Sequence, residues 1–569
     1  MARRAPFGLE DRIRLVARER GIASVNTFVD DPRLVGEPDP VEQPVEHAYE
    51  ETVTLHGHEV APFMFTKGMP LERDDEGRRY PEGLVPADRM VQNYRDPIRN
   101  RSSLAGIDEF ERGGDRLFIG VPSVHSISLS GMDPWRGVMP PAPDPRGARN
   151  AAEMIDVYAM EQVRDVPFVE WPNEPGDDAV GVPYDVLDAV EADLTAATGE
   201  DTLDGWWYDT DRLFVEADTD EVDWGPYVSQ FLLRELKLWA LNASQEYLRY
   251  PAGEDYNDTQ EAWLDTVEGR GEFAAETNPN QPPSDDQGHI ATPRHLATIV
   301  NAEPPFQEYL IATIQLLGDV DFDPGLPYTG RDDGNVFAYT DTGPVGLLDM
   351  LTRVARQALL AAFYHKYYVH FRCRPETYGG RIHAQRNLGA DIGVSSLVTD
   401  AEILSVRDGD EDYLSTAYVE GSPVHPAYPS GHSVIAGACG TVLKTWFTDV
   451  AWPYDDYYVP TADGQSRDTI PLPSGHTGVY QEIDKLMSNV GLARMFAGVH
   501  YYSDHYRGVK LGEQVAVGEL ADVFRRDFEG DESILPTFKP YLEYGADAAR
   551  EVSVETLDSL REEATSREG

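Results

Sequence analysis

Cysteine is nearly absent from this chain, whose 569 residues include only Cys373 and Cys439. So few thiols argue against a disulfide framework and against a metal site built from cysteine. Cys439 lies in an apolar, helix-like stretch, which favours a small buried thiol. Cys373 lies between two arginines, and we assign it no role.

Basic residues are also scarce, and lysine is the rarest of them. The chain has seven lysines, and its 48 basic residues stand against 100 acidic ones, for a net charge of −52. This charge excludes nucleic acid and anionic membranes as favourable partners. An acidic, lysine-poor surface suits concentrated salt, where the Debye length falls to about 3 Å and self-repulsion is screened. The composition therefore predicts a halophilic source, with an ordinary acidic protein as the alternative.

Long apolar runs are missing as well. No window reaches the roughly 18 uncharged apolar residues that a membrane helix needs, so no membrane span is predicted. The first residues, MARRAPFGLEDRIRLVARERG, carry an arginine pair without a following apolar stretch and do not form a recognisable secretion signal. We therefore expect a cytoplasmic protein by default, with export by an unrecognised route left open.

Helical periodicity dominates the sequence, and strand signals are few and short. The sequence therefore predicts an all-α fold, a large helical-bundle architecture with few short strands. The expected helices are Ala148–Arg164, Gly225–Tyr247, Pro293–Leu317, Val345–His370, Ser430–Trp446, Val479–Ala497 and Leu511–Phe524. The acidic connections that contain glycine or proline are expected to be surface loops. These connections are Glu216–Trp224, Pro251–Gln287, Asp319–Pro344 and Arg407–Asp412.

No clean linker divides the chain, so its expected organisation follows the helices. We expect an N-terminal segment at residues 1–45 and an N-terminal helical half at residues 46–320. A C-terminal catalytic helical bundle is expected at residues 321–530. A C-terminal tail is expected at residues 531–569, and its charged last segment, from Gly545, is expected to be helical or frayed.

Two short clusters place cations or anion-binding donors next to helix ends. The first, KYYVHFRCRPE, contains Lys366 and Arg374 before Pro375, which ends a helix pattern. The second, HPAYPSGHSVIAGA, runs from His425 to the start of an apolar helix at Ser430, Gly431 and His432. The free N–H groups of such a helix start can hold an oxyanion.

The third cluster, ARMFAGVHYYSDHYRG, contains Arg494, His500 and Asp504. A carboxylate four residues after an imidazole can fix the tautomer of the imidazole and raise its basicity. Each cluster alone is typical of an ordinary cap, turn or local hydrogen bond. All three in this order indicate a cationic pocket for a tetrahedral or trigonal-bipyramidal oxyanion.

This ordered set resembles the signature shared by vanadium-dependent haloperoxidases and type 2 phosphatidic acid phosphatases. Stretches from Phe63 to Glu513 resemble the bromoperoxidase-like branch of the haloperoxidases, whereas a phosphatase match would be confined to the core motifs. The resemblance implies a helical, often homo-oligomeric enzyme that uses vanadate as its cofactor. Such an enzyme oxidises bromide, and in some cases chloride or iodide, with hydrogen peroxide to hypohalous acid, which halogenates small organic substrates.

Residue roles follow from the same resemblance. It implies that vanadate oxygens are bound by Lys366, Arg374, Arg494, Ser430 and the Gly431 amide. It makes His500 the axial ligand to vanadium, oriented by Asp504, and His432 the acid/base residue on the opposite side. It also makes His425 an additional histidine that tunes halide oxidation.

Several neighbouring residues are left without a firm role. Arg372 and His370 are extra basic groups near the first cluster, and His365 is a candidate for shaping halide preference. His505 could compete for Asp504, but adjacent residues on a helix point in different directions, so we expect Asp504 to pair with His500. A second Pro-Ser-Gly-His at Pro473–His476 is interpreted as a turn and helix cap.

Two other functions remain open at this stage. A phosphatase with the same pocket would use His500 as the nucleophile, through a phosphohistidine, and His432 as the acid. A non-catalytic anion-binding protein would need only the cations. The complete set of two histidines and Asp504 argues against this last function.

Overall fold

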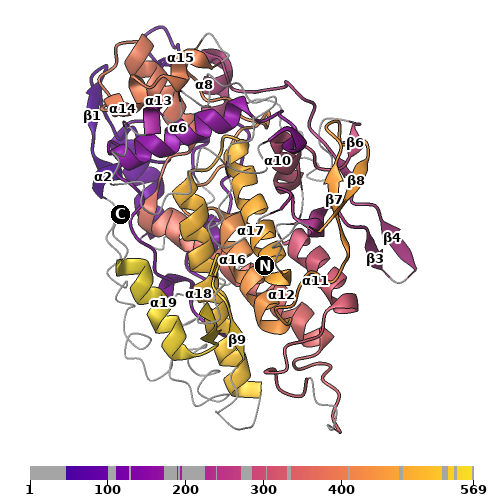
Figure 1. The fold of residues 1–569 in the computed structure, drawn as a ribbon. Coiled ribbons are helices and arrows are strands. Elements are labelled where there is room, and N and C mark those ends of the chain that lie inside the picture. The colour runs from indigo at the N-terminus through magenta and orange to yellow at the C-terminus, as the bar shows by residue number, and fades with distance from the viewer. Residues whose placement is uncertain are drawn as a thin grey trace, which may run out of the picture.

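The computed structural model describes residues 47–99, 110–171, 225–270, 285–472, 478–527 and 536–566, with short gaps inside these ranges and a few isolated residues between 189 and 214. Helices dominate these residues, which confirms the all-α prediction (Figure 1). The described strands form five separate two-stranded antiparallel sheets. The predicted segment at residues 1–45 and the second Pro-Ser-Gly-His lie outside the described residues.

The elements follow one another along the chain from α2 to α19, with a few short 3-10 and π turns among them. The longer helices are α6 (Ala148–Gln162), α8 (Gln260–Glu268), α10 (Pro293–Ala302), α11 (Gln307–Asp319), α12 (Pro344–Tyr364), α13 (Pro375–Asn387), α16 (Gly431–Trp446), α17 (Val479–Phe496), α18 (Tyr502–Asp527) and α19 (Val554–Ser566). The short helices are α2 (His47–Glu50), α3 (Ala87–Met90), α4 (Asp96–Arg99), α14 (Ser396–Thr399) and α15 (Ile403–Val406). The strands pair as β1 (Val53–Leu55) with β2 (His58–Val60), β3 (Leu236–Leu238) with β4 (Leu241–Ala243), β5 (Tyr247–Leu248) with β6 (Gln287–Gly288), β7 (Asp456–Pro460) with β8 (Arg467–Pro471), and β9 (Thr537–Phe538) with β10 (Arg550–Glu551).

The core of the fold is a bundle in which α16 packs against α12, α17 and α18. Figure 1 shows these helices in the middle of the molecule, with α11 and α19 beside them and α6, α13, α14 and α15 gathered at one end. Almost every residue of α16 is buried. Among the described helices, none is both long and apolar enough to cross a membrane.

The expected helices in the second half of the chain are confirmed, with small shifts in their ends. The helix predicted at Val345–His370 is α12 followed by a π-helical turn, His365–His370. The helix predicted from Leu511 begins earlier, at Tyr502, so Asp504 lies in its first turn. The charged C-terminal tail contains α19, in agreement with the expected helical tail.

Two expectations in the first half were wrong. The segment predicted as one helix, Gly225–Tyr247, is a single 3-10 turn followed by the β3–β4 hairpin, because tertiary strand pairing overrides a weak helical period. The stretch predicted as a loop, Pro251–Gln287, contains α8. Gly269 ends this helix at a φ of 76°, and the helix buries Trp263 against the core.

The helix predicted at Pro293–Leu317 is two helices, α10 and α11. Pro304 and Pro305 lie between them. Proline has no backbone N–H and disfavours the helical conformation at the residue before it, so the helix ends here. The helical spacing of apolar residues in the sequence nevertheless continues across this point.

Glycines allow α16 and α18 to approach closely. A Cβ placed on Gly512 would overlap the Val434 carbonyl oxygen, and a Cβ on Gly437 would overlap the Val509 carbonyl oxygen. We expect Gly512→Ala to lower the free energy of unfolding by about 1–3 kcal/mol, the usual range for overpacking a core. Thermal unfolding would measure the loss. Gly318→Ala in α11 is the matched control, because nothing lies within 4 Å of its Cβ position, and an equal loss in the two variants would contradict the account.

Candidate active site

Lys366 is held in place by the π-helical turn that follows α12. Its side chain is fully buried. Its Nζ donates hydrogen bonds to the carbonyl oxygens of Pro426 at 2.8 Å and Ala427 at 2.7 Å. The ammonium group therefore fixes the loop that leads into α16.

Arg374 is the N-cap residue of α13, and its guanidinium group contacts two of the predicted histidines. Its Nη1 donates to His500 Nε2 at 2.8 Å, and its Nη2 donates to His425 Nδ1 at 2.9 Å. Further hydrogen bonds to the carbonyl oxygens of His425 and Val499 fix the plane of the guanidinium group. One buried cation thus joins the loop before α16 to the loop before α18.

The start of α16 supplies backbone donors. Ser430 is the N-cap residue, and its Oγ accepts from the Ser433 amide at 3.4 Å. The Ser430 amide itself donates to the backbone oxygen of Asp504 at 2.8 Å, which ties this helix start to the start of α18. Gly431 and His432 form the first turn, where amides lack partners within the helix.

Arg494 reaches the site from the last turn of α17. It is buried, and its Nη1 donates to the Val300 carbonyl at 2.8 Å and to the Tyr418 hydroxyl at 3.3 Å. Its Nε is buried and has no hydrogen-bond partner among the described residues. This cation therefore retains an unused donor.

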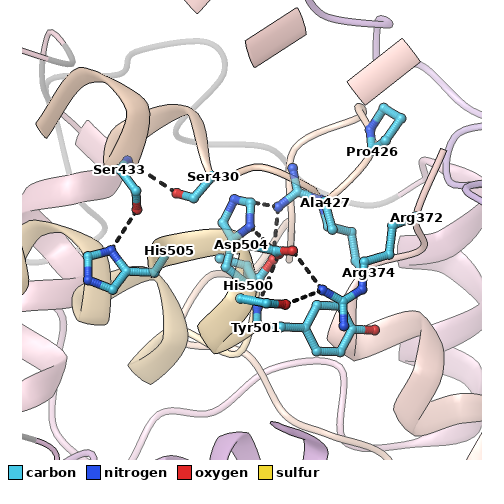
Figure 2. A network of polar contacts seen from close by, with 12 residues as sticks. Arg372, Arg374, Pro426, Ala427, Ser430, Ser433, His500, Tyr501, Asp504 and His505 are labelled. Atoms are coloured by element: carbon cyan, nitrogen blue, oxygen red, sulfur yellow. Dashed lines mark hydrogen bonds and ion pairs between the residues drawn. The ribbon is translucent and has the colours of Figure 1, made fainter. Parts of the chain in front are cut away.

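His500 and Asp504 form the expected pair. His500 Nδ1 lies 2.7 Å from Asp504 Oδ2, and Figure 2 shows this contact together with that of Arg374 on the other ring nitrogen. Donation from Nδ1 to the carboxylate, and acceptance at Nε2 from Arg374, define a neutral imidazole. His505 hydrogen-bonds to Ser433 Oγ at 2.9 Å, so it leaves Asp504 to His500, as predicted.

Arg372, which the sequence left without a role, lies behind this pair. It donates to Asp504 Oδ1 at 2.9 Å and to a Glu153 carboxylate oxygen at 2.7 Å. Its guanidinium carbon lies 3.6 Å from the centre of the Tyr501 ring. Arg372 therefore orients Asp504 from outside the cavity. The contact with α6 spans a long sequence separation, and no local motif could have revealed it.

These elements surround one cavity of about 340 Å³. Six predicted site residues line it: Lys366, His425, Gly431, His432, Arg494 and His500. The other three predicted residues lie directly behind the lining. Arg374 contacts His425 and His500, Asp504 contacts His500, and Ser430 directly precedes Gly431. His365 and His370 are not among the described lining residues; their rings stack on each other with centroids 5.6 Å apart.

The site carries uncompensated positive charge. Lys366, Arg374 and Arg494 are buried, and in the described part of the chain none of them lies within 4.0 Å of a carboxylate oxygen. Burial lowers the pKa of Lys366 well below its usual value, with Arg374 adding to the effect. Burial and the charge of Arg494 lower the pKa of Arg374 to about 9. A bound anion would relieve both the repulsion and the desolvation.

The three histidines of the cavity are neutral in this setting. Burial lowers the pKa of His500 well below its usual value, and Arg374 and Lys366 lower it further. The pKa of His425 and of His432 is lowered in the same way, by burial first and then by neighbouring cations. In the described residues no group of three or more His, Cys, Asp or Glu could hold a metal cation. Buried cations beside neutral imidazoles form a donor set that suits an oxyanion.

Other lining residues were not predicted from the sequence. Phe363 lies one helical turn before Lys366, a spacing that could have revealed it. Glu420 lies five positions before His425, but nothing in the sequence distinguishes it from the many other acids. Arg116 and Asn301 also line the cavity, and neither belongs to a recognisable functional motif.

Known proteins resemble this chain over most of its length. The vanadium-dependent bromoperoxidase of Corallina officinalis is 29% identical over 541 residues, covering 80% of this chain and 86% of its own. That of Ascophyllum nodosum is 28% identical, covering 69% of this chain and 71% of its own. The family model of the VCPO second helical-bundle domain matches residues 348–528, which contain every predicted site residue.

A solved structure supports the same relationship at the level of the fold. The homohexameric second vanadate-dependent bromoperoxidase from Ascophyllum nodosum superposes with a TM-score of 0.71 at 20% identity, covering 95% of this chain and 91% of its own. The sequence similarity and the fold similarity each extend over most of the chain, and the domain match lies in its second half. The chain is homologous to the vanadium-dependent bromoperoxidases, which are enzymes, over most of its length.

Proposed function

We propose that this protein is a vanadate-dependent haloperoxidase that oxidises bromide with hydrogen peroxide to hypohalous acid, which then halogenates organic molecules. The observation that carries this proposal is the set of three buried cations without carboxylate partners around the neutral His500 imidazole. The bromoperoxidase relatives supply the halide by their names. Chloride and iodide are the alternative halides, and replacing bromide by each of them in the assay below compares the three.

The residues present fit vanadate. Lys366, Arg374 and Arg494 would hold the charged oxygens, assisted by Ser430 and the Gly431 amide at the start of α16. His500 would bind vanadium through Nε2, because Asp504 engages Nδ1; the Nε2 lone pair, which here accepts from Arg374, would then be given to vanadium while Arg374 turns to an oxygen of the anion. Vanadate, when bound, supplies a Lewis acid that activates peroxide without changing its own oxidation state.

His432 is suited to hold and release a proton. It lies in the first turn of α16, is half-buried and lines the cavity. Burial and the nearby cations keep the pKa of His432 low, and the negative charge of an oxyanion would raise it again. A histidine tuned in this way can accept a proton from peroxide and return it to the departing oxygen. His425, held by Arg374 and packed edge-on against Phe363, is positioned to tune halide oxidation from the same wall.

Lys366 has a second task besides binding. Its ammonium group is fixed by two carbonyls and lines the cavity, so it can stabilise negative charge that develops on a leaving oxygen.

We further propose that the protein forms a homo-oligomer, as the homohexameric relative does.

The test is a comparison of two reactions on one preparation. The protein is purified in concentrated salt, stripped of oxyanion with phosphate and dialysed, and then assayed for bromination of a phenol-type dye with and without orthovanadate. We expect bromination only after vanadate is added, and its loss when phosphate is returned. Phosphate-ester hydrolysis is measured in parallel. Robust hydrolysis without vanadate-dependent bromination would overturn the proposal and favour the phosphohistidine mechanism.

A further inference from the structure

The cavity is larger and more apolar than a reaction between a halide ion and peroxide requires. Its lining includes Ile119, Val300, Leu359, Ala362, Phe363 and Pro423. A volume of about 340 Å³ is that of a small organic ligand site, and ligand sites of this kind combine apolar walls with a few fixed polar groups. The room beside the cations is therefore suited to an organic molecule.

One carboxylate interrupts this otherwise cationic and apolar lining. Glu420 is the only acidic residue among the described residues that line the cavity, and it is 4% exposed. Its Oε1 accepts a hydrogen bond at 3.2 Å from Asn301, which lines the cavity as well. Its Oε2 is buried and has no hydrogen-bond partner within the described part of the chain. A buried carboxylate oxygen without a donor is costly, so this position calls for a donor from outside the protein.

The position of Glu420 is fixed on both sides. Its backbone carbonyl accepts from Arg116 Nη1 at 2.7 Å and from Lys67 Nζ at 3.1 Å, and Lys67 is itself paired with the buried Glu376. On the other side, the Asn301 amide that contacts Oε1 also donates to the Tyr250 hydroxyl at 2.8 Å. A ligand would therefore meet an acceptor that is already oriented.

We propose that Glu420 determines the specificity for the organic acceptor: its Oε2 accepts a hydrogen bond from the O–H group of a neutral phenol-type molecule whose ring packs against Phe363 and Leu359. This inference rests on the proposed haloperoxidase function, since it names the class of molecule that is halogenated. It assigns the apolar side of the cavity to that molecule and the cationic side to the oxyanion. An anionic acceptor would be disfavoured, because the Glu420 carboxylate repels it.

The experiment measures binding and does not require turnover. The full-length protein, with vanadate and without peroxide, is titrated with 2-naphthol and with 2-methoxynaphthalene, which keeps the ring system and lacks the O–H group. Ligand fluorescence gives each Kd. We expect 2-naphthol to bind the wild type about tenfold more tightly than the ether, since a hydrogen bond to a charged group has about this effect. Glu420→Gln should weaken 2-naphthol about tenfold and the ether less than about twofold.

Controls separate recognition from a general loss of structure. Glu246→Gln changes an exposed glutamate outside the cavity lining and should leave both affinities as in the wild type. Equal weakening of both ligands by Glu420→Gln would show a structural role and overturn the proposal. If Glu420→Gln fails to fold, the wild-type comparison still decides, because equal Kd values for the two ligands would contradict it. Tribromide formation by the wild type needs no organic acceptor, so its absence would count against the haloperoxidase function and not against this subsite.

Discussion

His500→Ala should abolish tight vanadate binding. We expect the Kd for vanadate to rise by at least about 100-fold, because removing a group that only orients a metal ligand costs 10–100-fold and this variant removes the ligand itself. The His500 ring is oriented by a carboxylate at Nδ1 and by a guanidinium group at Nε2, the nitrogen assigned to vanadium. Equilibrium dialysis of vanadate against the stripped protein measures the change.

A graded series tests this reasoning. Asp504→Asn keeps His500 but weakens its orientation, so its loss of affinity should lie between those of the wild type and His500→Ala. His58→Ala, in the β1–β2 hairpin, is the control and should bind as the wild type does. Full vanadate affinity in His500→Ala would show that the assigned ligand is wrong.

Lys366→Met should retain some vanadate binding and lose turnover. The variant keeps the length of the side chain but removes an ammonium group held by two carbonyl oxygens. We expect kcat to fall about 100- to 1,000-fold, as for other fixed donors that stabilise developing charge, and the Kd for vanadate to rise about tenfold. Bromination at saturating vanadate separates the two effects.

The matched control for Lys366→Met is Lys237→Met, an exposed lysine in β3, which should keep wild-type kcat. Thermal unfolding of both variants is needed, because Lys366→Met leaves two buried carbonyl oxygens without their donor. A folded Lys366→Met variant with unchanged kcat would contradict the role given to this ammonium group.

The helical bundle could be predicted because its signals are local. α16 and α17 are long, buried and bounded by recognisable caps or turns. The helical spacing of their apolar residues could therefore be recognised in the sequence. The β3–β4 hairpin and the break before α11 could not be predicted as reliably. The hairpin depends on strand pairing in the folded chain, and the helical period continued past Pro304 and Pro305.

The cationic and histidine groups of the site could be named from three short motifs. The structure places all of them in the lining of one cavity except Arg374, which contacts the lining residues His425 and His500. Their electrostatic state could not be predicted. The neutrality of His500 depends on burial and on Arg374, and the orientation of Asp504 depends on Arg372 and α6. The sequence does not distinguish Glu420 from the other acidic residues, of which the chain has 100 in all. The role proposed for it depends on its place in the cavity lining, which only the fold determines.

The halophilic source inferred from composition receives no support from the fold or from the relatives, and it stays a prediction. The net charge of −52 nevertheless gives it a measurable consequence. Self-repulsion should weaken as salt is added, because the Debye length shortens.

The central claim is that three buried cations and a neutral His500 form an oxyanion site that takes vanadate. Calorimetric titration of orthovanadate into the phosphate-stripped wild-type protein tests it most directly. The account predicts saturable binding of one vanadate per chain, weakened by competing phosphate, with bromination activity that rises in proportion to occupancy. Binding that does not saturate, or activity that is independent of bound vanadate, would contradict it.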